Sequence, residues 1–160
     1  MAPGAEDRSQ IRRVLFACTF NTTRSPMAAG LLRHFHKGAI EAASIGVHRS
    51  ERVDPRAVEV MAEIGIDISR HRPVTLTDLE SWGEDPADCD LIVALSPAAQ
   101  RHALELTRYS TVAVEYWPAP DATQPTKGED EEPLAAYRAL REDLTERLKA
   151  RFGAPRGVTV

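Results

Sequence analysis

Short runs rich in apolar residues alternate along this chain with segments that have helical spacing. The runs are residues 14–17 (VLFA), 40–45 (IEAASI), 91–95 (LIVAL) and 111–114 (TVAV). Short apolar runs bounded by polar clusters are typical of strands buried on both faces of a sheet. The pairs Ser25-Pro26, Asp54-Pro55 and Ser96-Pro97 predict helix starts, because Ser and Asp cap helices and Pro suits the first helical position. This alternation constrains the chain to right-handed βαβ units around a parallel sheet.

The predicted fold is therefore α/β: a small doubly wound sheet of four parallel strands with helices on both faces. The helices are expected to run from Pro26 to Gly38, from Pro55 to Gly65, from Pro97 to Leu106 and through an amphipathic segment from Leu134 to Leu148. A short helical turn is expected near Thr77. In sheets of this kind, ligands bind beyond the carboxyl ends of the strands, so residues that follow the strands are the candidates for function.

The length of 160 residues fits one domain. Residues 11–152 are predicted to form a single α/β domain, residues 1–10 a disordered lead-in and residues 153–160 a loose tail. A proline-rich loop is expected at residues 117–125 and an acidic turn at residues 128–133. No linker divides the chain in two.

Composition excludes several classes of partner. A net charge of −4 and a pI near 5.7 argue against a nucleic-acid partner. No apolar run approaches the ~20 residues that cross a bilayer, and the first ten residues do not resemble a secretory signal, so no membrane partner is expected. Two cysteines without an export signal favour the cytoplasm. No His and Cys residues have metal-ligand spacing, so we expect neither a metal nor a cofactor.

One stretch, ACTFNTTRSP at residues 17–26, joins the first strand to the first helix. Backbone N–H groups in such a loop can form an anion cradle, and the helix dipole adds partial positive charge. Arg24 offers a planar fork that matches two oxygens of a tetrahedral oxyanion. Cys18 would feel the same field, which favours its thiolate. The interpretation is a nucleophile beneath a bound phosphate; the alternative is a buried core cysteine with Arg24 as a surface charge.

The segment CTFNTTRSP resembles the phosphate-binding loop of the low-molecular-weight protein tyrosine phosphatases, whose pattern is Cys-x-x-Asn-x-x-Arg-Ser, commonly followed by Pro. Further segments resemble the same family: residues 43–46 (ASIG), residues 65–67 (GID) with His71, and residues 90–95. The resemblance implies the doubly wound fold already predicted. The sequence departs from the family pattern at two loop positions, where Phe20 replaces the usual Gly and Thr23 replaces a common second cysteine.

By this resemblance Cys18 is the nucleophile and Arg24 binds phosphate with the loop. Asn21 shapes the loop, and Ser25 assists the thiolate. The expected phosphate-binding set is Thr19, Phe20, Asn21, Thr22, Thr23, Arg24 and Ser25. Because Thr23 is not a cysteine, a protective disulfide with the nucleophile is not available.

The general acid that protonates the leaving group is expected to be Asp121, in the loop after the fourth strand. The family places an Asp-Pro pair in this loop, whereas Asp121 is followed by Ala122. The alternative interpretation is an aspartate that only forms a turn, but the reach of this loop toward Cys18 favours the acid. Glu115 is a poorer candidate because it lies nearer the strand. Other residues of this edge, His48, Arg49 and Trp117, are expected either to line the rim or to have no role in the site.

The predicted function is a metal-independent phosphatase that acts on phosphate monoesters, with protein phosphotyrosine as the class implied by the resemblance. Its expected partners are a phosphorylated protein or a small aryl phosphate, and inorganic phosphate or another oxyanion. One alternative is an arsenate reductase that uses the same cysteine. The resolving cysteine of that branch corresponds to Ser96, and Cys89 lies at the wrong end of its strand, so an external thiol would be needed. A second alternative is a non-catalytic oxyanion-binding module.

Overall fold

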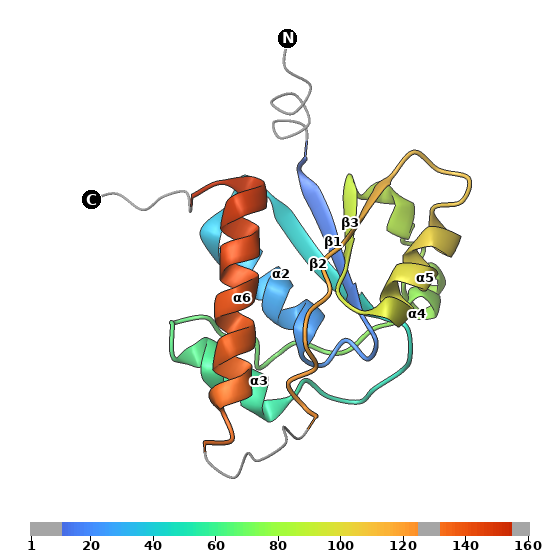
Figure 1. The fold of residues 1–160 in the computed structure, drawn as a ribbon. Helices are drawn as coiled ribbons and strands as arrows, with labels where there is room; N and C mark the ends of the chain where they lie inside the picture. The colour runs from blue at the N-terminus through green and yellow to red at the C-terminus, as the bar shows by residue number, and fades with distance from the viewer. Residues whose placement is uncertain (1–10, 125–131, 155–160) are drawn as a thin grey trace.

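The four segments expected to be strands form one parallel sheet in the computed structural model, which describes residues 11–124 and 132–154 (Figure 1). The strands are β1 (Arg13–Cys18), β2 (Glu41–Gly46), β3 (Leu91–Ala94) and β4 (Ala113–Tyr116), in the spatial order β2-β1-β3-β4. The predicted α/β class and four-stranded parallel sheet are therefore confirmed.

Strand order fixes where a ligand can bind. The chain leaves β1 to form β2 on one side and later returns to place β3 on the other, so the order reverses at β1. In register, Cys18 lies opposite Gly46 of β2, and Ala17 lies opposite Ala94 of β3. The crevice at such a reversal, beyond the carboxyl ends of the strands, is the usual ligand site of doubly wound sheets. Cys18 ends β1 at this position.

Two layers of helices cover the sheet. Helices α2 (Arg24–Phe35), α3 (Pro55–Ala62) and α6 (Ala135–Phe152) lie on one side, and α4 (Leu76–Ser81), the 3-10 turn η1 (Pro86–Asp88) and α5 (Pro97–Leu106) lie on the other (Figure 1). The alternation along β1 produces this arrangement: Val14 and Phe16 enter the core under α2 and α6, whereas Leu15 and Ala17 enter the core under α5.

Polar caps set the starts of three helices. Asp54 accepts a hydrogen bond from the backbone N–H of Arg56, and Ser96 accepts one from the N–H of Ala99, as their Asp-Pro and Ser-Pro pairs predicted. Near Thr77, where only a helical turn was expected, Thr75 and Asp78 form a capping box that starts α4. Two reciprocal bonds stabilise this short helix.

Several boundaries differ from the prediction: α2 and α3 end three residues before Gly38 and Gly65, and α6 continues four residues past Leu148. Two further differences, at the starts of α2 and β4, have a visible cause. Helix α2 begins at Arg24, with Thr23 before it, so Ser25 is not its cap. The Ser25 hydroxyl contacts the Cys18 sulfur instead. Strand β4 begins two residues later than predicted, because the Ser110 hydroxyl accepts from the N–H of Val112 and holds that segment in a turn.

Some predictions lie outside the described residues: the lead-in at residues 1–10, residues 128–131 of the acidic turn at residues 128–133, and the tail beyond residue 154. In the ranges that the structure does cover, none of the helices has both the length and the apolar character needed to cross a membrane.

Glu63, just after α3, forms ion pairs with two arginines of α6, and we therefore expect the stability of the fold to depend on pH. Hydrogen bonds from Arg138 and then Arg141, together with their charges, lower the pKa of Glu63 from its ordinary 4.5 to about 2. A carboxyl group whose pKa is lower in the folded protein than in the unfolded chain stabilises the fold fully at pH values above its unfolded-state pKa. This stabilisation is lost as the pH falls toward the folded-state pKa. We expect Glu63→Gln to lower the melting temperature at pH about 7, and the difference from wild type to shrink toward pH about 3.

The control for this prediction is Glu146→Gln, an exposed glutamate of α6 with the same charge change. Thermal unfolding of the three proteins at several pH values is the measurement. A Glu63→Gln penalty that stays constant from pH about 7 to about 3 would contradict the ion-pair explanation.

Candidate active site

Cys18 ends β1 with its sulfur enclosed by the loop that follows. Its side chain is only 2% exposed. The Sγ atom lies 2.8 Å from Ser25 Oγ, and the backbone N–H of Ser25 points to the same sulfur at 3.4 Å. Because residues 19–23 form the turn between β1 and α2, the first amides of the helix face the sulfur. Both contacts, like the helix dipole, favour negative charge on the sulfur.

The hydrogen-bond pattern of Ser25 indicates which way its hydroxyl points. Its Oγ accepts from the Asn21 side-chain amide at 2.8 Å. That amide must be oriented this way, because Asn21 Oδ1 accepts from the backbone N–H of Val74 at 2.9 Å. With its oxygen already accepting, Ser25 can donate its own proton to Cys18 Sγ, its nearest acceptor.

Asn21 holds the loop in its curved form. It is fully buried and has a left-handed backbone with φ of 59°, a conformation that asparagine tolerates better than most residues. Its amide nitrogen also donates to Ser44 Oγ of β2 at 2.9 Å. The sequence predicted a loop-shaping role for Asn21; its bond to Ser44 was not anticipated, because the two residues are distant in the chain.

His71 supports the same residue from the loop before α4. Its Nε2 lies 3.1 Å from both the backbone oxygen and Oδ1 of Asn21. Both atoms are acceptors, so Nε2 must carry a proton. Burial lowers the pKa of His71, although the bond to Asn21 acts in the opposite direction. A neutral histidine with a protonated Nε2 meets these requirements.

Arg24, the first residue of α2, lies between the loop and the segment after β4. Its Nη1 donates to the backbone oxygen of Ala119 at 3.1 Å, and its Nη2 reaches Thr19 Oγ1 at 3.5 Å. Thr19 in turn donates to Ser96 Oγ at 3.0 Å. These contacts hold the guanidinium beside the loop that also encloses Cys18.

Asp54 anchors the second half of the loop, a role that its Asp-Pro helix signal did not reveal. Its Oδ2 accepts from Thr23 Oγ1 at 2.9 Å and from Tyr137 Oη of α6 at 2.7 Å. Its backbone N–H donates to the oxygen of Thr22. Burial and the bond to Asp54 raise the pKa of Tyr137, which keeps it a donor. The sequence indicated Tyr137 only as a core residue on the inner face of its helix.

Asp121 lies in the segment that Arg24 contacts, two residues after Ala119, whose backbone oxygen accepts from Arg24. Its Oδ1 accepts from the N–H and hydroxyl of Thr123 at 3.0 and 2.6 Å. Burial raises the pKa of Asp121, but the Thr123 bonds and the charge of Arg24 outweigh it, and the net shift is downward. Asp121 and Arg24 are thus electrostatic neighbours, and the Asp121 carboxylate is ionised at neutral pH.

Other candidates of this edge have structural partners. Glu115 accepts from Trp117 Nε1 and from Arg151 of α6. The Trp117 ring packs between Phe16 and Phe152, with centroids 6.2 and 6.4 Å away, so it covers the sheet.

Phe20 is the one apolar side chain of the loop that is largely exposed, at 49%. Its ring lies beside His48, with centroids 5.7 Å apart. The backbone N–H of His48 donates to the backbone oxygen of Thr19 at 2.8 Å, so this pair borders the loop. Among residues 11–124 and 132–154, no three acidic, His or Cys side chains are grouped so as to hold a metal ion.

Cys89 lies far from the loop. It precedes β3, and Ala94, five residues further on, lies beside Ala17. At ~3.3 Å per residue the two cysteines are separated by roughly 15 Å, too far for a disulfide. Burial raises the pKa of Cys89 to about 11, and its thiol donates to the oxygen of Pro86. At neutral pH it is a protonated thiol.

Gly46 allows the loop to approach β2. A Cβ atom at this position would lie 2.8 Å from the carbonyl carbon of Phe20 and 2.9 Å from the Asn21 backbone nitrogen. We expect Gly46→Ala to displace the loop and to lower kcat on an aryl phosphate by about 10-fold to 100-fold. Steady-state kinetics together with inhibition by inorganic phosphate would measure the effect.

Gly30→Ala is the matched control. Its Cβ would meet the side chains of Ile68 and Met61 in the core, at 2.9 and 3.3 Å, without touching the loop. It should lower the melting temperature while kcat changes little. If Gly46→Ala lost stability but kept full kcat, the close approach would not control the geometry of the loop.

A four-stranded doubly wound sheet whose first strand ends in a cysteine, followed by an amide-lined loop and an arginine at a helix start, defines an oxyanion-binding α/β protein. Comparison with known proteins identifies the family. The sequence pattern of the low molecular weight phosphotyrosine protein phosphatases matches residues 13–153, and the chain belongs to this family.

Three relatives illustrate its range. A probable low molecular weight protein-tyrosine-phosphatase, EpsP, of Ralstonia solanacearum is 42% identical over 92 residues, which are 57% of this chain and 60% of EpsP. An arsenate reductase of Halalkalibacterium halodurans is 31% identical over 85% of this chain and 91% of its own length. The crystal structure of a low molecular weight protein tyrosine phosphatase from T. tengcongensis superimposes with a TM-score of 0.65 at 31% identity, over 84% of this chain and 93% of that one.

Proposed function

We propose that this protein is a metal-independent phosphatase that hydrolyses phosphate monoesters, with phosphotyrosine in proteins as its substrate class. The observation that carries the proposal is the 2.8 Å contact between Ser25 Oγ and Cys18 Sγ within a loop that begins a helix. The sulfur accepts hydrogen bonds from a hydroxyl and from a backbone N–H, and it lies at the positive end of a helix dipole. Such a sulfur is suited to act as a thiolate nucleophile.

In the first step, the Cys18 thiolate attacks phosphorus and forms an S–P bond while the P–O bond to the leaving group breaks. Arg24 and the loop amides hold the equatorial oxygens, whose charge they stabilise in the transition state. Asp121 donates a proton to the leaving oxygen in the fraction of the protein in which it is protonated, a fraction that is small at neutral pH because its pKa is lowered. The products are a phosphocysteine and an alcohol or phenol.

In the second step, water attacks the phosphocysteine. Asp121, now a carboxylate, accepts a proton from this water as the new P–O bond forms and the S–P bond breaks. The sulfur leaves as a thiolate, which the Ser25 hydroxyl and the helix start stabilise. Inorganic phosphate departs, and both catalytic groups return to their starting protonation states.

Three arguments favour an aryl phosphate. A phenol, with a pKa near ~10, leaves more readily than an alkyl alcohol. The relative EpsP carries the name of a protein-tyrosine-phosphatase. The exposed Phe20 ring beside the loop adds an aromatic surface on which a substrate ring could pack.

Arsenate reduction is the second candidate, and the length over which the chain matches a named arsenate reductase favours it. In this reaction a thiolate attacks arsenate, and two thiols together supply the two electrons that reduce arsenic. Cys89 cannot be the second thiol, since it lies at the other end of β3 with its pKa raised to about 11. Ser96, at the near end, has a hydroxyl that caps α5. An external thiol would therefore be required.

A single pair of assays tests the proposal. Hydrolysis of an aryl phosphate and of a phosphotyrosine peptide is measured beside arsenate-dependent oxidation of an added dithiol. We expect turnover of both phosphates and no oxidation above the protein-free rate. Dithiol oxidation without phosphate release would establish the reductase. Phosphate binding without either reaction would establish an oxyanion-binding module.

Asp121→Asn tests the general acid. On phenyl phosphate we expect kcat to fall by about 10²-fold or more, and on p-nitrophenyl phosphate by less, because a better leaving group needs less protonation. Since the pKa of Asp121 is below its ordinary value, its protonated fraction decreases as pH rises. Wild-type kcat/KM on phenyl phosphate should therefore decline from pH about 5 to about 8, and the variant should lose this dependence. An equal loss on both substrates would exclude the role.

A further inference from the structure

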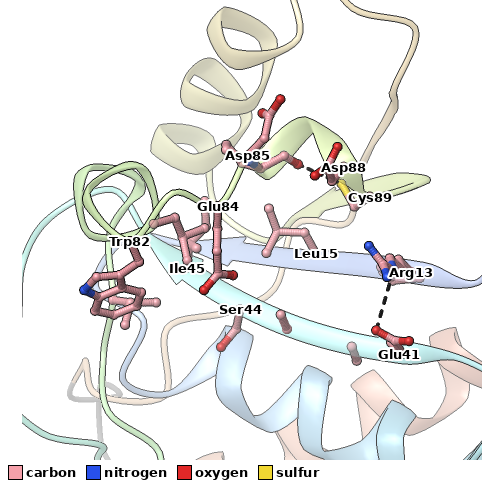
Figure 2. Close-up of a pocket in the computed structure, with 16 residues that line it drawn as sticks. Arg13, Leu15, Glu41, Ser44, Ile45, Trp82, Glu84, Asp85, Asp88 and Cys89 are labelled. Carbon is pink, nitrogen blue, oxygen red and sulfur yellow. Dashed lines mark hydrogen bonds and ion pairs between the residues drawn. The ribbon is translucent and has the colours of Figure 1, made fainter.

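A pocket of about 360 Å³, whose lining contains no residue of the Cys18 loop, lies between the sheet and the segment that joins α4 to β3. Figure 2 shows strands β1 and β2 beneath it, with residues of the joining segment, including Glu84 and Asp85, above. Its volume falls within the ~300–1,000 Å³ that is usual for ligand pockets.

The floor of this pocket is apolar. Leu15 of β1 and Ile45 of β2 contribute side chains, and Leu79 of α4 lies at one wall. At one end Trp82 is 59% exposed, an unusual exposure for so large an apolar ring. Trp82 thus presents an aromatic surface at the mouth of an apolar pocket.

The rim is acidic. Glu41, Glu84, Asp85 and Asp88 line it, against the single cation Arg13, which already pairs with Glu41 at 3.6 Å. In Figure 2 the Glu84 side chain points from the joining segment toward β2, between Trp82 and Leu15. No ion pair involves Glu84 within the described part of the chain, so its carboxylate is available to a ligand.

The electrostatic potential around Cys89, at one end of the pocket, is negative. The carboxylates of Asp90 and Asp88 add to burial, the larger cause, in raising the pKa of this thiol. The same field would attract a cation to this end of the pocket.

No residue of the Cys18 loop lines this pocket, although Ser44 and Val74 of its lining bond to Asn21 of that loop. The pocket extends to Arg13 and Glu41, which pair at the amino ends of β1 and β2, whereas Cys18 ends β1. Its floor residues Leu15 and Ile45 belong to the core under α5, and Cys18 belongs to the core under α2 and α6. A ligand can therefore occupy it without touching the proposed catalytic residues.

We propose that this pocket is a docking site for a short basic segment of a partner protein, which inserts one arginine side chain between Trp82 and Glu84 and rests an apolar neighbour on Leu15 and Ile45. A guanidinium is planar, stacks on an indole and donates hydrogen bonds from its edge to a carboxylate, so it matches both groups at once. The unbalanced acidic rim selects a basic segment over an acidic one.

The test uses nuclear magnetic resonance of the two tryptophan indole N–H groups, assigned with Trp82→Phe. The probe is the blocked peptide acetyl-Ala-Leu-Arg-Leu-Arg-Ala-amide. It should shift the Trp82 signal saturably and leave that of Trp117, which donates to Glu115 across the sheet edge, unmoved. A peptide with citrulline at both arginines, similar in shape but uncharged, should bind at least about fivefold more weakly.

Matched variants localise the effect. Glu84→Gln should weaken binding of the arginine peptide by about threefold or more, whereas Glu146→Gln, on α6 across the sheet, should leave it unchanged. Unaltered hydrolysis of a small aryl phosphate by Glu84→Gln would show that its fold is intact. Equal binding of the two peptides, equal effects of the two variants, or binding of N-acetyl-arginine amide as tight as that of the peptide would overturn the docking site.

Discussion

Replacing Cys18 with serine should lower turnover of an aryl phosphate by about 10⁴-fold or more, because a serine hydroxyl is a far weaker nucleophile than the thiolate proposed for Cys18. The reaction would lose the step that forms a covalent intermediate. Stopped-flow measurement of product release should show a burst only in the wild type if breakdown of the intermediate is slow. Binding of inorganic phosphate, measured by calorimetry, should remain within a few-fold of wild type, because the loop amides and Arg24 are unchanged.

Cys89→Ser is the matched control for this experiment. It makes the same chemical change at the other cysteine, which precedes β3, whereas the far end of β3 lies beside Cys18. The Cys89 thiol is protonated at neutral pH. The substitution should leave kcat within about twofold of wild type, since it alters no group near the reacting atoms. Turnover that survives Cys18→Ser would refute the mechanism. Turnover that is lost only in Cys89→Ser would show that Cys89, and not Cys18, is the nucleophile.

The second large effect is expected at Arg24. Arg24→Lys preserves the charge but removes the planar fork, and the two bonds to Ala119 and Thr19 cannot both be kept. We expect kcat on an aryl phosphate to fall by about 10²-fold, the loss typical when one donor to a developing oxyanion is removed. Inhibition by inorganic phosphate should weaken by a smaller factor, because the charge remains.

Arg33→Lys offers a control on the same helix, since Arg33 also donates to a backbone oxygen, that of Ala42, but faces β2 away from the loop. It should leave kcat near the wild-type value. If Arg24→Lys changed kcat by less than about threefold, the planar geometry of the guanidinium would not matter, and Arg24 would act only as a nearby charge.

The sequence was most informative where local physics decides the outcome. The apolar run at residues 91–95 can only be buried, and Asp54-Pro55 and Ser96-Pro97 start helices through bonds to residues two or three positions away. The starts of these elements were predicted to within a residue or two. Ser25-Pro26 has the same signal, yet Ser25 turns to the sulfur, because a contact with Cys18 seven residues earlier replaces the cap.

The site was predicted only in the part that is contiguous in the chain. Residues 18–25 carry a recognisable pattern, but the groups that brace them come from elsewhere: Ser44 from β2, Asp54 before α3 and Tyr137 from α6. Tyr137 lies 83 positions from Asp54, and nothing in its periodicity distinguishes it from an ordinary core residue. Such long-range hydrogen bonds become visible only when the fold is known.

The replacement of a loop cysteine by Thr23 has a consequence for oxidative stress. Peroxide that reaches Cys18 would form a sulfenic acid, which is normally captured by a nearby thiol. Here the Thr23 hydroxyl is bonded to Asp54, and the remaining cysteine lies at the far end of β3. Oxidation would therefore proceed toward irreversible sulfinic acid unless a small thiol such as glutathione intervenes. The recovery of activity after exposure to peroxide would then depend on the concentration of this external thiol and not on a second cysteine of the protein.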